Sequence, residues 1–261
     1  MTTSNAIQGT AAGVPFVALP PAGDGPAPLV VTWHLMEPPA SEAAMADAVP
    51  MRGLDAWRVY FGLPMSGARL PEGGFDEFFR LAGEDYVLNV MEPVTGQAAD
   101  EFPAAVAALR ERFAIADGPV GVAGGSAGST VALEVLARAE VPIAAAAVVS
   151  PVPQLAPAVG RNERFYGMTY PWTDRSRAVA DHYDYVSRAG ELGADLLLVV
   201  GEADDVAFRE PSAALHRALG DRSKLVTVPG MAHTLAEEDG TPNEHAAAVD
   251  AEFTAWFSAR R

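Results

Sequence analysis

Cysteine is missing from this sequence of 261 residues. Its absence excludes disulfide bridges, thiolate metal sites and cysteine nucleophiles. The pattern HExxH, the Walker phosphate loop and a GxGxxG turn after a strand are missing as well, which leaves no recognisable metal or nucleotide motif. We therefore expect no metal and no cofactor.

Long apolar runs are also missing. The longest, Ile143–Val149, is far too short to span a bilayer. The first residues of the chain lack the basic region and the apolar core of a secretory signal. We therefore expect no membrane-spanning segment and a cytoplasmic protein.

Basic residues are few: 18 Lys and Arg stand against 34 Asp and Glu, for a formal net charge of −16. A negative field of this size repels nucleic acid and anionic lipid. We expect a small-molecule substrate and no nucleic-acid partner. The simplest role of the acidity is solubility, and the sequence does not predict an oligomeric state.

What is present favours a globular α/β protein. Hydrophobic residues make up 49% of the chain, whose length suits one sizeable domain or two small ones. Short apolar runs alternate with stretches of helical spacing. The predicted strands are 29–33, 57–61, 120–123, 144–149, 196–200 and 225–228, and the predicted helices are 41–48, 102–113, 126–139, 212–219 and 244–260. This alternation indicates a mostly parallel sheet covered on both faces, with an antiparallel edge around Ile7 and Val14–Leu19.

Two segments, residues 65–97 and 151–190, fit this alternation poorly. Both follow strand ends, and in open sheets of this kind the sites lie beyond the carboxyl ends of the strands. Both also carry several aromatic residues. We predict a single domain over residues 1–261 in which these two segments are lid or insert elements over a mainly apolar pocket.

The sequence Gly124-Gly125-Ser126-Ala127-Gly128 follows a predicted strand and precedes a predicted helix. A Gly-x-Ser-x-Gly turn in this position strains the serine backbone and raises its hydroxyl above the sheet, where small neighbours avoid clashes. Without that context the pattern is common by chance, and Ser126 could simply cap the helix. The context favours Ser126 as a nucleophile.

A serine nucleophile needs a base and an acid that orients the base. Among the five histidines, His233 lies in a loop directly after the last predicted strand, at the same sheet edge as Ser126. The acid candidates are Asp204 and Asp205, which follow the strand at 196–200. The resulting order of serine, aspartate and histidine is the one expected of this arrangement.

With these residues the chain resembles the α/β-hydrolase superfamily, from about residue 29 to residue 256. In that family the acid usually comes three residues after the glycine that ends its strand. Gly201-Glu202-Ala203-Asp204 matches this pattern. The resemblance therefore favours Asp204 over Asp205, with Glu202 as a third choice.

The resemblance also implies an oxyanion hole after the strand at 29–33, where relatives often carry His-Gly-x. Here His34 matches, but Leu35 replaces the glycine. The expected donors are the backbone N–H groups of Met36, or less favourably Leu35, and of Ala127. We expect His34 to support this loop, and Leu35 and Met36 to add apolar bulk that narrows the approach to the site.

The implied chemistry is acyl transfer through an acyl-enzyme, without a metal. The leading hypothesis is a serine hydrolase that cleaves a carboxylic ester of a small or medium acyl substrate. A thioesterase or a small peptidase would use the same residues. A binding protein without catalytic activity is the remaining alternative, because a fold does not imply a function.

Overall fold

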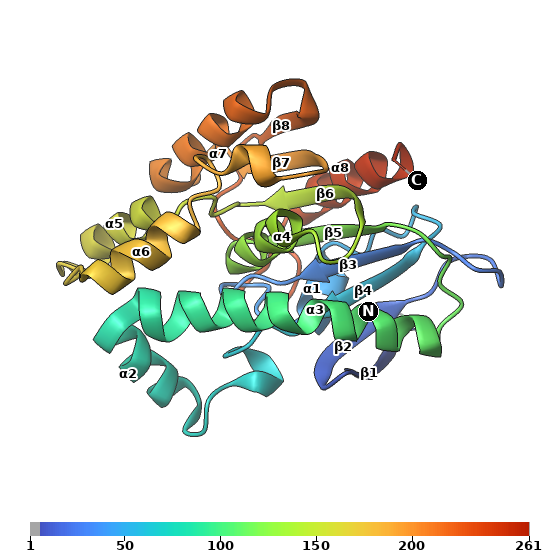
Figure 1. Ribbon diagram of the computed structural model, residues 1–261, viewed down its shortest axis with the longest axis horizontal. Coiled ribbons are helices and arrows are strands. Elements are labelled where there is room, and N and C mark those ends of the chain that lie inside the picture. The colour runs from blue at the N-terminus through green and yellow to red at the C-terminus, as the bar shows by residue number, and fades with distance from the viewer. Residues whose placement is uncertain (1–5, 261) are drawn as a thin grey trace.

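The computed structural model describes residues 6–260. Eight strands form one sheet in the order β1-β2-β4-β3-β5-β6-β7-β8 (Figure 1). They are β1 (Ile7–Ala11), β2 (Val14–Leu19), β3 (Leu29–Trp33), β4 (Trp57–Phe61), β5 (Val120–Gly125), β6 (Ile143–Val149), β7 (Asp195–Gly201) and β8 (Ser223–Val228). β2 is antiparallel to β1 and β4, and all other neighbours are parallel. The predicted parallel sheet with an antiparallel edge is confirmed.

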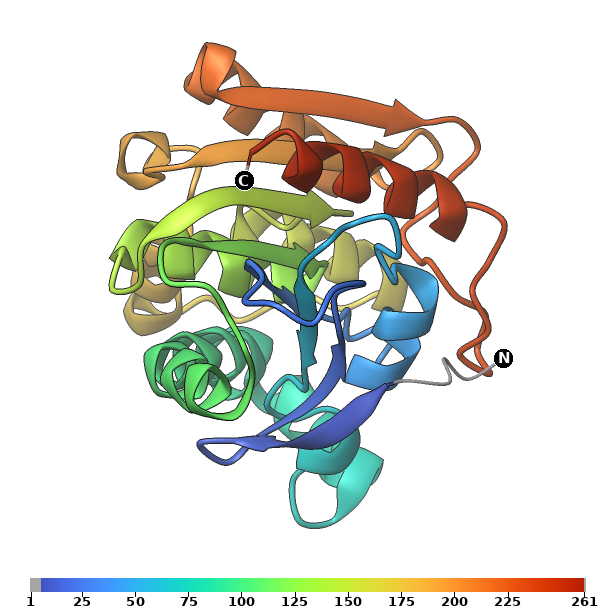
Figure 2. The ribbon, with the colours of Figure 1, turned by 90° about the vertical axis from the view of Figure 1, so that its right-hand side faces the viewer.

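Helices cover both faces of the sheet. They are α1 (Glu42–Ala48), α2 (Gly74–Tyr86), α3 (Glu92–Arg112), α4 (Ala127–Arg138), α5 (Leu155–Tyr166), α6 (Asp174–His182), α7 (Val206–Leu219) and α8 (Ala246–Ser258). α1 and α8 lie on one face, and α3, α4 and α7 lie on the other (Figure 2). The described chain therefore has three layers with the sheet in the middle.

The central strands are largely apolar because each face of the sheet meets a separate core. In β6, Ala146 and Val148 enter the core beneath α3 and α4, whereas Ala145, Ala147 and Val149 enter the core beneath α1 and α8. This alternation follows from the two-residue period of a strand. Because a strand buried on both sides is held rigidly, the first residues of the loop that follows its carboxyl end are held in place as well.

The segments 65–97 and 151–190, which fit the predicted alternation of strands and helices poorly, are largely helical. The first holds α2, a π-helical turn at Val87–Met91 and the beginning of α3. α3 starts ten residues before the predicted helix, and Pro103 lies inside it. Proline removes a backbone donor and is disfavoured in helix interiors but tolerated in the first turn. The local pattern around Pro103 therefore predicted that the helix begins near residue 102, which is too late. The second segment holds α5 and α6.

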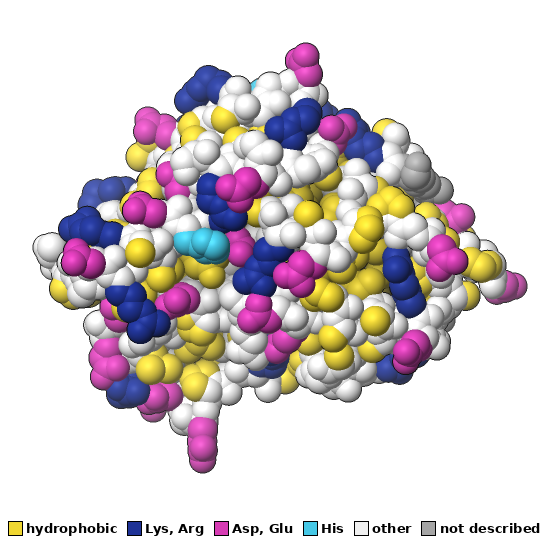
Figure 3. All heavy atoms as spheres, in the orientation of Figure 1, with side chains coloured by type: hydrophobic (Ala, Val, Ile, Leu, Met, Phe, Trp, Pro, Cys, Tyr) yellow, Lys and Arg dark blue, Asp and Glu magenta, His cyan; other side chains and the backbone are white. Residues whose placement is uncertain are grey.

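The face formed by α3, α4 and α6 carries acidic and basic side chains side by side (Figure 3). The net negative charge of the chain therefore does not give this face a field of one sign. None of the helices within residues 6–260 is both long and apolar enough to cross a membrane.

Candidate active site

Ser126 occupies a tight turn between β5 and α4. Its backbone has φ 47° and ψ −118°, a region that non-glycine residues rarely adopt. A Cβ atom on Gly124 would lie 2.1 Å from the carbonyl oxygen of Gly128, and one on Gly128 would lie 2.4 Å from that of His34. Both flanking glycines are therefore required by close backbone approach, and the strain concentrates on Ser126.

His233 and Asp204 join Ser126 at the carboxyl edge of the sheet. The Nε2 atom of His233 is 2.9 Å from Ser126 Oγ, and its Nδ1 atom is 2.9 and 3.1 Å from the two carboxylate oxygens of Asp204. The three side chains come from loops after β8, β7 and β5. They form a continuous hydrogen-bonded chain from a carboxylate through an imidazole to a hydroxyl.

Two further contacts hold His233, one at its ring and one at its backbone, and neither was predicted from the sequence. Phe208 in α7 lies against the imidazole, with ring centroids 4.3 Å apart. The hydroxyl of Ser150 donates to the His233 carbonyl oxygen over 2.7 Å. Ser150 directly follows β6, so its place at a strand end was the only available signal.

The surroundings of His233 favour its charged form. Burial by itself lowers the pKa of the imidazole, but the hydrogen bond that its Nδ1–H donates to Asp204 and the nearby charge of Glu37 raise the pKa above its usual value. Asp204 has a side chain only 2% exposed, so its carboxylate acts on the ring with little screening. The arrangement suits an imidazole that must accept and stabilise a proton.

The other two acid candidates have different partners. Asp205 caps α7 by accepting from the Ala207 backbone N–H over 2.8 Å, and it pairs with Arg164. Glu202 accepts from the backbone N–H of Gly230. The structure therefore places Asp204, and neither alternative, against His233.

The loop after β3 is arranged partly as expected. His34 is fully buried, and burial lowers its pKa to about 4. Its Nε2 accepts from the Leu63 backbone N–H and its Nδ1 faces the Leu35 carbonyl oxygen, so the neutral ring supports the loop. Met36 and Ala127 line the cavity beside Ser126. Within residues 6–260 their backbone N–H groups donate to no protein acceptor.

The expected role of Leu35 was wrong. Its side chain is fully buried in the core beneath α1 and α8 and does not line the cavity. There it fills the space above Gly125, where an added Cβ would lie 2.3 Å from Leu35 Cδ1. The residue that replaces the usual glycine therefore does not narrow the approach to Ser126.

Glu37, which the sequence did not single out, lies at the centre of the site. Its Oε2 atom is 2.9 Å from Ser126 Oγ and 3.9 Å from His233 Nε2. Its side chain is 46% exposed. A carboxylate directly after Met36, the expected oxyanion donor, was the only sequence signal available, and that pattern is too common to carry a prediction.

A cavity of about 240 Å³ opens beside Ser126. Its walls come from the Met36 loop, from the 65–97 segment and from the 151–190 segment, together with Phe208. The lining is mainly apolar and aromatic: Met36, Met65, Phe75, Phe78, Phe79, Tyr86, Met91, Val152, Leu155, Ala158, Tyr166 and Phe208. These are the three segments between which the sequence places the pocket.

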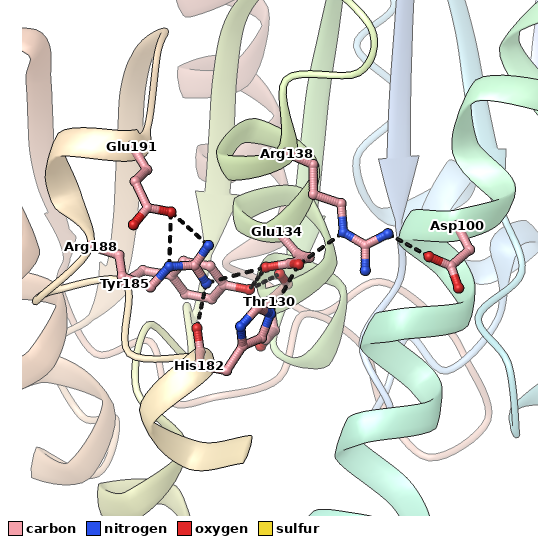
Figure 4. Close-up of polar contacts among 8 residues, drawn as sticks. All are labelled: Asp100, Thr130, Glu134, Arg138, His182, Tyr185, Arg188 and Glu191. Atoms are coloured by element: carbon pink, nitrogen blue, oxygen red, sulfur yellow. Dashed lines mark hydrogen bonds and ion pairs between the residues drawn. The ribbon is translucent and has the colours of Figure 1, made fainter. Parts of the chain in front are cut away.

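A second polar cluster surrounds Glu134 of α4 (Figure 4). Its side chain is 2% exposed and contacts Arg138 at 2.9 Å, His182 at 3.2 Å and Arg188 at 3.5 Å. The hydroxyl of Tyr185 also donates to it over 3.1 Å. This cluster joins the helix after Ser126 to the end of α6 and the turn that follows, so it is structural rather than part of the site.

The remaining histidines lie elsewhere. His216 contacts Ser223 Oγ through its Nδ1 over 2.8 Å, and His245 precedes α8 beside Glu244. Both are partly exposed; His216 lies within α7, whereas His245 lies in the turn before α8, although the predicted helix began at residue 244.

Comparison with known proteins extends this picture. A 64-residue stretch is 33% identical to an uncharacterized protein of Mycobacterium tuberculosis, but the match spans only 24% of this chain and 23% of that protein. An α/β-hydrolase enzyme from the metagenome of lagoon sediments in Morocco has a TM-score of 0.62 at 13% identity, with coverage of 97% and 99%. A puromycin-hydrolyzing peptidase of M. tuberculosis has a TM-score of 0.66 at 19% identity, and the alignment covers 98% of this chain but 39% of that protein.

These likenesses confirm the predicted α/β-hydrolase fold. The family comparison is more specific, since residues 81–259 match the prolyl oligopeptidase family. That stretch contains Ser126, Asp204 and His233 but not the loop with Met36 and Glu37. The chain belongs to the prolyl oligopeptidase family of α/β-hydrolases.

Proposed function

We propose that the protein is a serine hydrolase in which Ser126 is the nucleophile, His233 the general base and Asp204 the acid that orients it. The observation that supports this assignment most directly is the unbroken contact from Asp204 through His233 to Ser126, with each step near 3 Å. A protein that only binds a ligand has no need of this arrangement.

In the proposed reaction His233 Nε2 takes the hydroxyl proton as Ser126 Oγ bonds to the acyl carbon. The carbonyl oxygen becomes an oxyanion, which the backbone N–H groups of Met36 and Ala127 stabilise. The intermediate then collapses, the bond to the leaving group breaks, and His233 returns its proton to that group. Water, activated by the same imidazole, releases the acid from the acyl-enzyme.

The preferred substrate class is a carboxylic ester with a small or medium acyl group. The cavity of about 240 Å³ limits the acyl part, and its aromatic walls favour an apolar one. We further propose that residues 1–261 act as one domain in which the segments 65–97 and 151–190 form a fixed lid over the acyl group.

A second candidate is a small peptidase, which the family membership favours. The solved relative from M. tuberculosis is a puromycin-hydrolyzing peptidase, but this chain corresponds to only 39% of it. Nothing in the described site separates an ester from an amide, because the attacking group and the donors are the same.

The test combines labelling with a substrate panel. A fluorophosphonate should modify Ser126 in the wild type, and Ser126→Ala should remain folded and unlabelled. Acyl esters, thioesters and peptidyl amides with the same acyl group should then be compared by kcat/KM. Labelling at another serine, with Ser126 unmodified, would refute the assignment.

A further inference from the structure

Glu37 places a carboxylate where an incoming acyl group must bind. Among the described residues that line the cavity it carries the only carboxylate, and Arg161 is the only other charged residue. Ser126 has one hydroxyl hydrogen but two acceptors at 2.9 Å, Glu37 Oε2 and His233 Nε2. Without a substrate, Glu37 therefore competes with the base for the hydroxyl proton.

This position is electrostatically unfavourable for a neutral substrate. The oxyanion forms one bond from the carbon that Ser126 Oγ attacks, so it develops close to the Glu37 carboxylate. Like charges at such short range oppose each other strongly where water is partly excluded. A carboxylate beside an oxyanion hole is expected to slow acyl transfer unless a positive charge accompanies the substrate.

The protein supplies only part of that positive charge, on the His233 imidazolium, which is shared with Asp204. Within residues 6–260, His233 is the only basic side chain with a nitrogen within 4 Å of a Glu37 oxygen. Arg161 lines the same cavity, but its guanidinium lies over the Phe165 ring at 4.8 Å and donates to Asn162 Oδ1. Glu37 is thus available to a cation from outside.

We infer that Glu37 binds an ammonium group on the carbon next to the substrate carbonyl, so that the favoured acyl groups are α-amino acyl groups with an apolar side chain. An ammonium nitrogen two bonds from the carbonyl carbon lies about 2.5 Å from it. The reacting carbon itself approaches Ser126 Oγ to about 3–3.5 Å. An ammonium in this position reaches the Glu37 carboxylate without any movement of the backbone.

The inference rests on the proposed function, and it assigns a binding partner in the site to each of three parts of the substrate. The ammonium contacts Glu37, the carbonyl oxygen faces the N–H groups of Met36 and Ala127, and the apolar side chain enters the aromatic cavity. Binding of the ammonium also removes Glu37 as a competitor for the Ser126 proton. The hydroxyl is then left to His233, which couples recognition to activation of the nucleophile.

The test compares a matched pair of reagents that modify the nucleophile without turnover: diphenyl 1-amino-2-phenylethylphosphonate and the analogue that lacks the amino group. The measured quantity is the ratio of their rates of covalent modification of Ser126, followed by mass spectrometry. Glu37→Gln should lower this ratio by roughly 10- to 100-fold relative to the wild type, as expected for loss of a charged hydrogen bond. Intrinsic reactivity cancels in this comparison.

Two further variants sharpen the result. Glu37→Lys should lower the ratio more than Glu37→Gln, because it places like charges together. Glu111→Gln, at an exposed position near the far end of α3, removes the same charge and should leave the ratio unchanged. An equal ratio in the wild type and Glu37→Gln would overturn the inference and leave the proposed function intact. Failure of both reagents and of a fluorophosphonate to modify Ser126 would overturn the proposed function, and the inference with it.

Discussion

Removal of the buried Glu134 carboxylate should destabilise the protein strongly. Glu134→Ala leaves Arg138, Arg188 and His182 without their common partner, and loss of one member of a buried ion pair costs about 3–5 kcal/mol. We expect the lower end of this range, because three of the neighbours of Glu134 keep another polar partner in the variant. Arg138 still pairs with Asp100, and Arg188 still pairs with Glu191. The Tyr185 hydroxyl still donates to the Thr130 carbonyl oxygen. We therefore expect a loss of about 3 kcal/mol.

The measurement is the midpoint of thermal unfolding. For a chain of this size each kcal/mol shifts Tm by about 2–4 °C, so Glu134→Ala should lower Tm by roughly 6–12 °C. The matched control is Asp100→Asn, which removes the other partner of Arg138 but at a side chain that is 71% exposed. Such a surface pair is worth about 0–1 kcal/mol. Equal shifts in the two variants would refute the reasoning.

The same cluster predicts how stability depends on pH. Burial by itself raises the pKa of Glu134, but the hydrogen bonds from Arg138 and His182 bring it below its usual value. A carboxyl group with a lowered pKa stabilises the fold above the ordinary glutamate pKa of about 4.3, and this contribution is lost as the pH falls through the folded value. The stability difference between the wild type and Glu134→Gln should therefore shrink in acid.

Two other predictions concern the site. Asp204→Asn should reduce kcat/KM by several orders of magnitude, because the triad acts as a unit, whereas Asp205→Asn should have a small effect; the reverse order would show that Asp205 orients His233. The acid limb of the kcat/KM profile should lie above the ordinary histidine pKa of about 6.5, since activity needs neutral His233 and its pKa is raised. Glu37→Gln should move that limb to lower pH, and the control Glu111→Gln should leave it in place. An unchanged limb in Glu37→Gln would show that Glu37 does not raise the pKa of His233.

Much of the fold could be predicted because strand signals are local. Each buried strand is a short apolar run, and the predicted strands fall within one or two residues of those in the structure. Helix starts were harder, as α3 shows, because Pro103 gives a local signal that the surrounding packing overrides.

The meeting of Ser126, Asp204 and His233 could be predicted because each lies in the loop that follows a strand, and the carboxyl ends of parallel strands meet at one edge. Leu35 and Glu37 could not. The direction of a loop side chain depends on what packs around it: Leu35 turns into the core over Gly125, and Glu37 turns toward Ser126. Nothing in the order of residues along the loop encodes that choice.

His233 follows β8, one of the two edge strands of the sheet. β8 has a neighbour on one side only, and most of its residues are at least partly exposed. Peripheral strands of this kind open at a lower free energy than the central ones. Opening of β8 would withdraw His233 while β5 and Ser126 stay in place. We therefore expect activity to be lost on heating before the whole molecule unfolds, because local opening of the last strand is enough to separate His233 from Ser126.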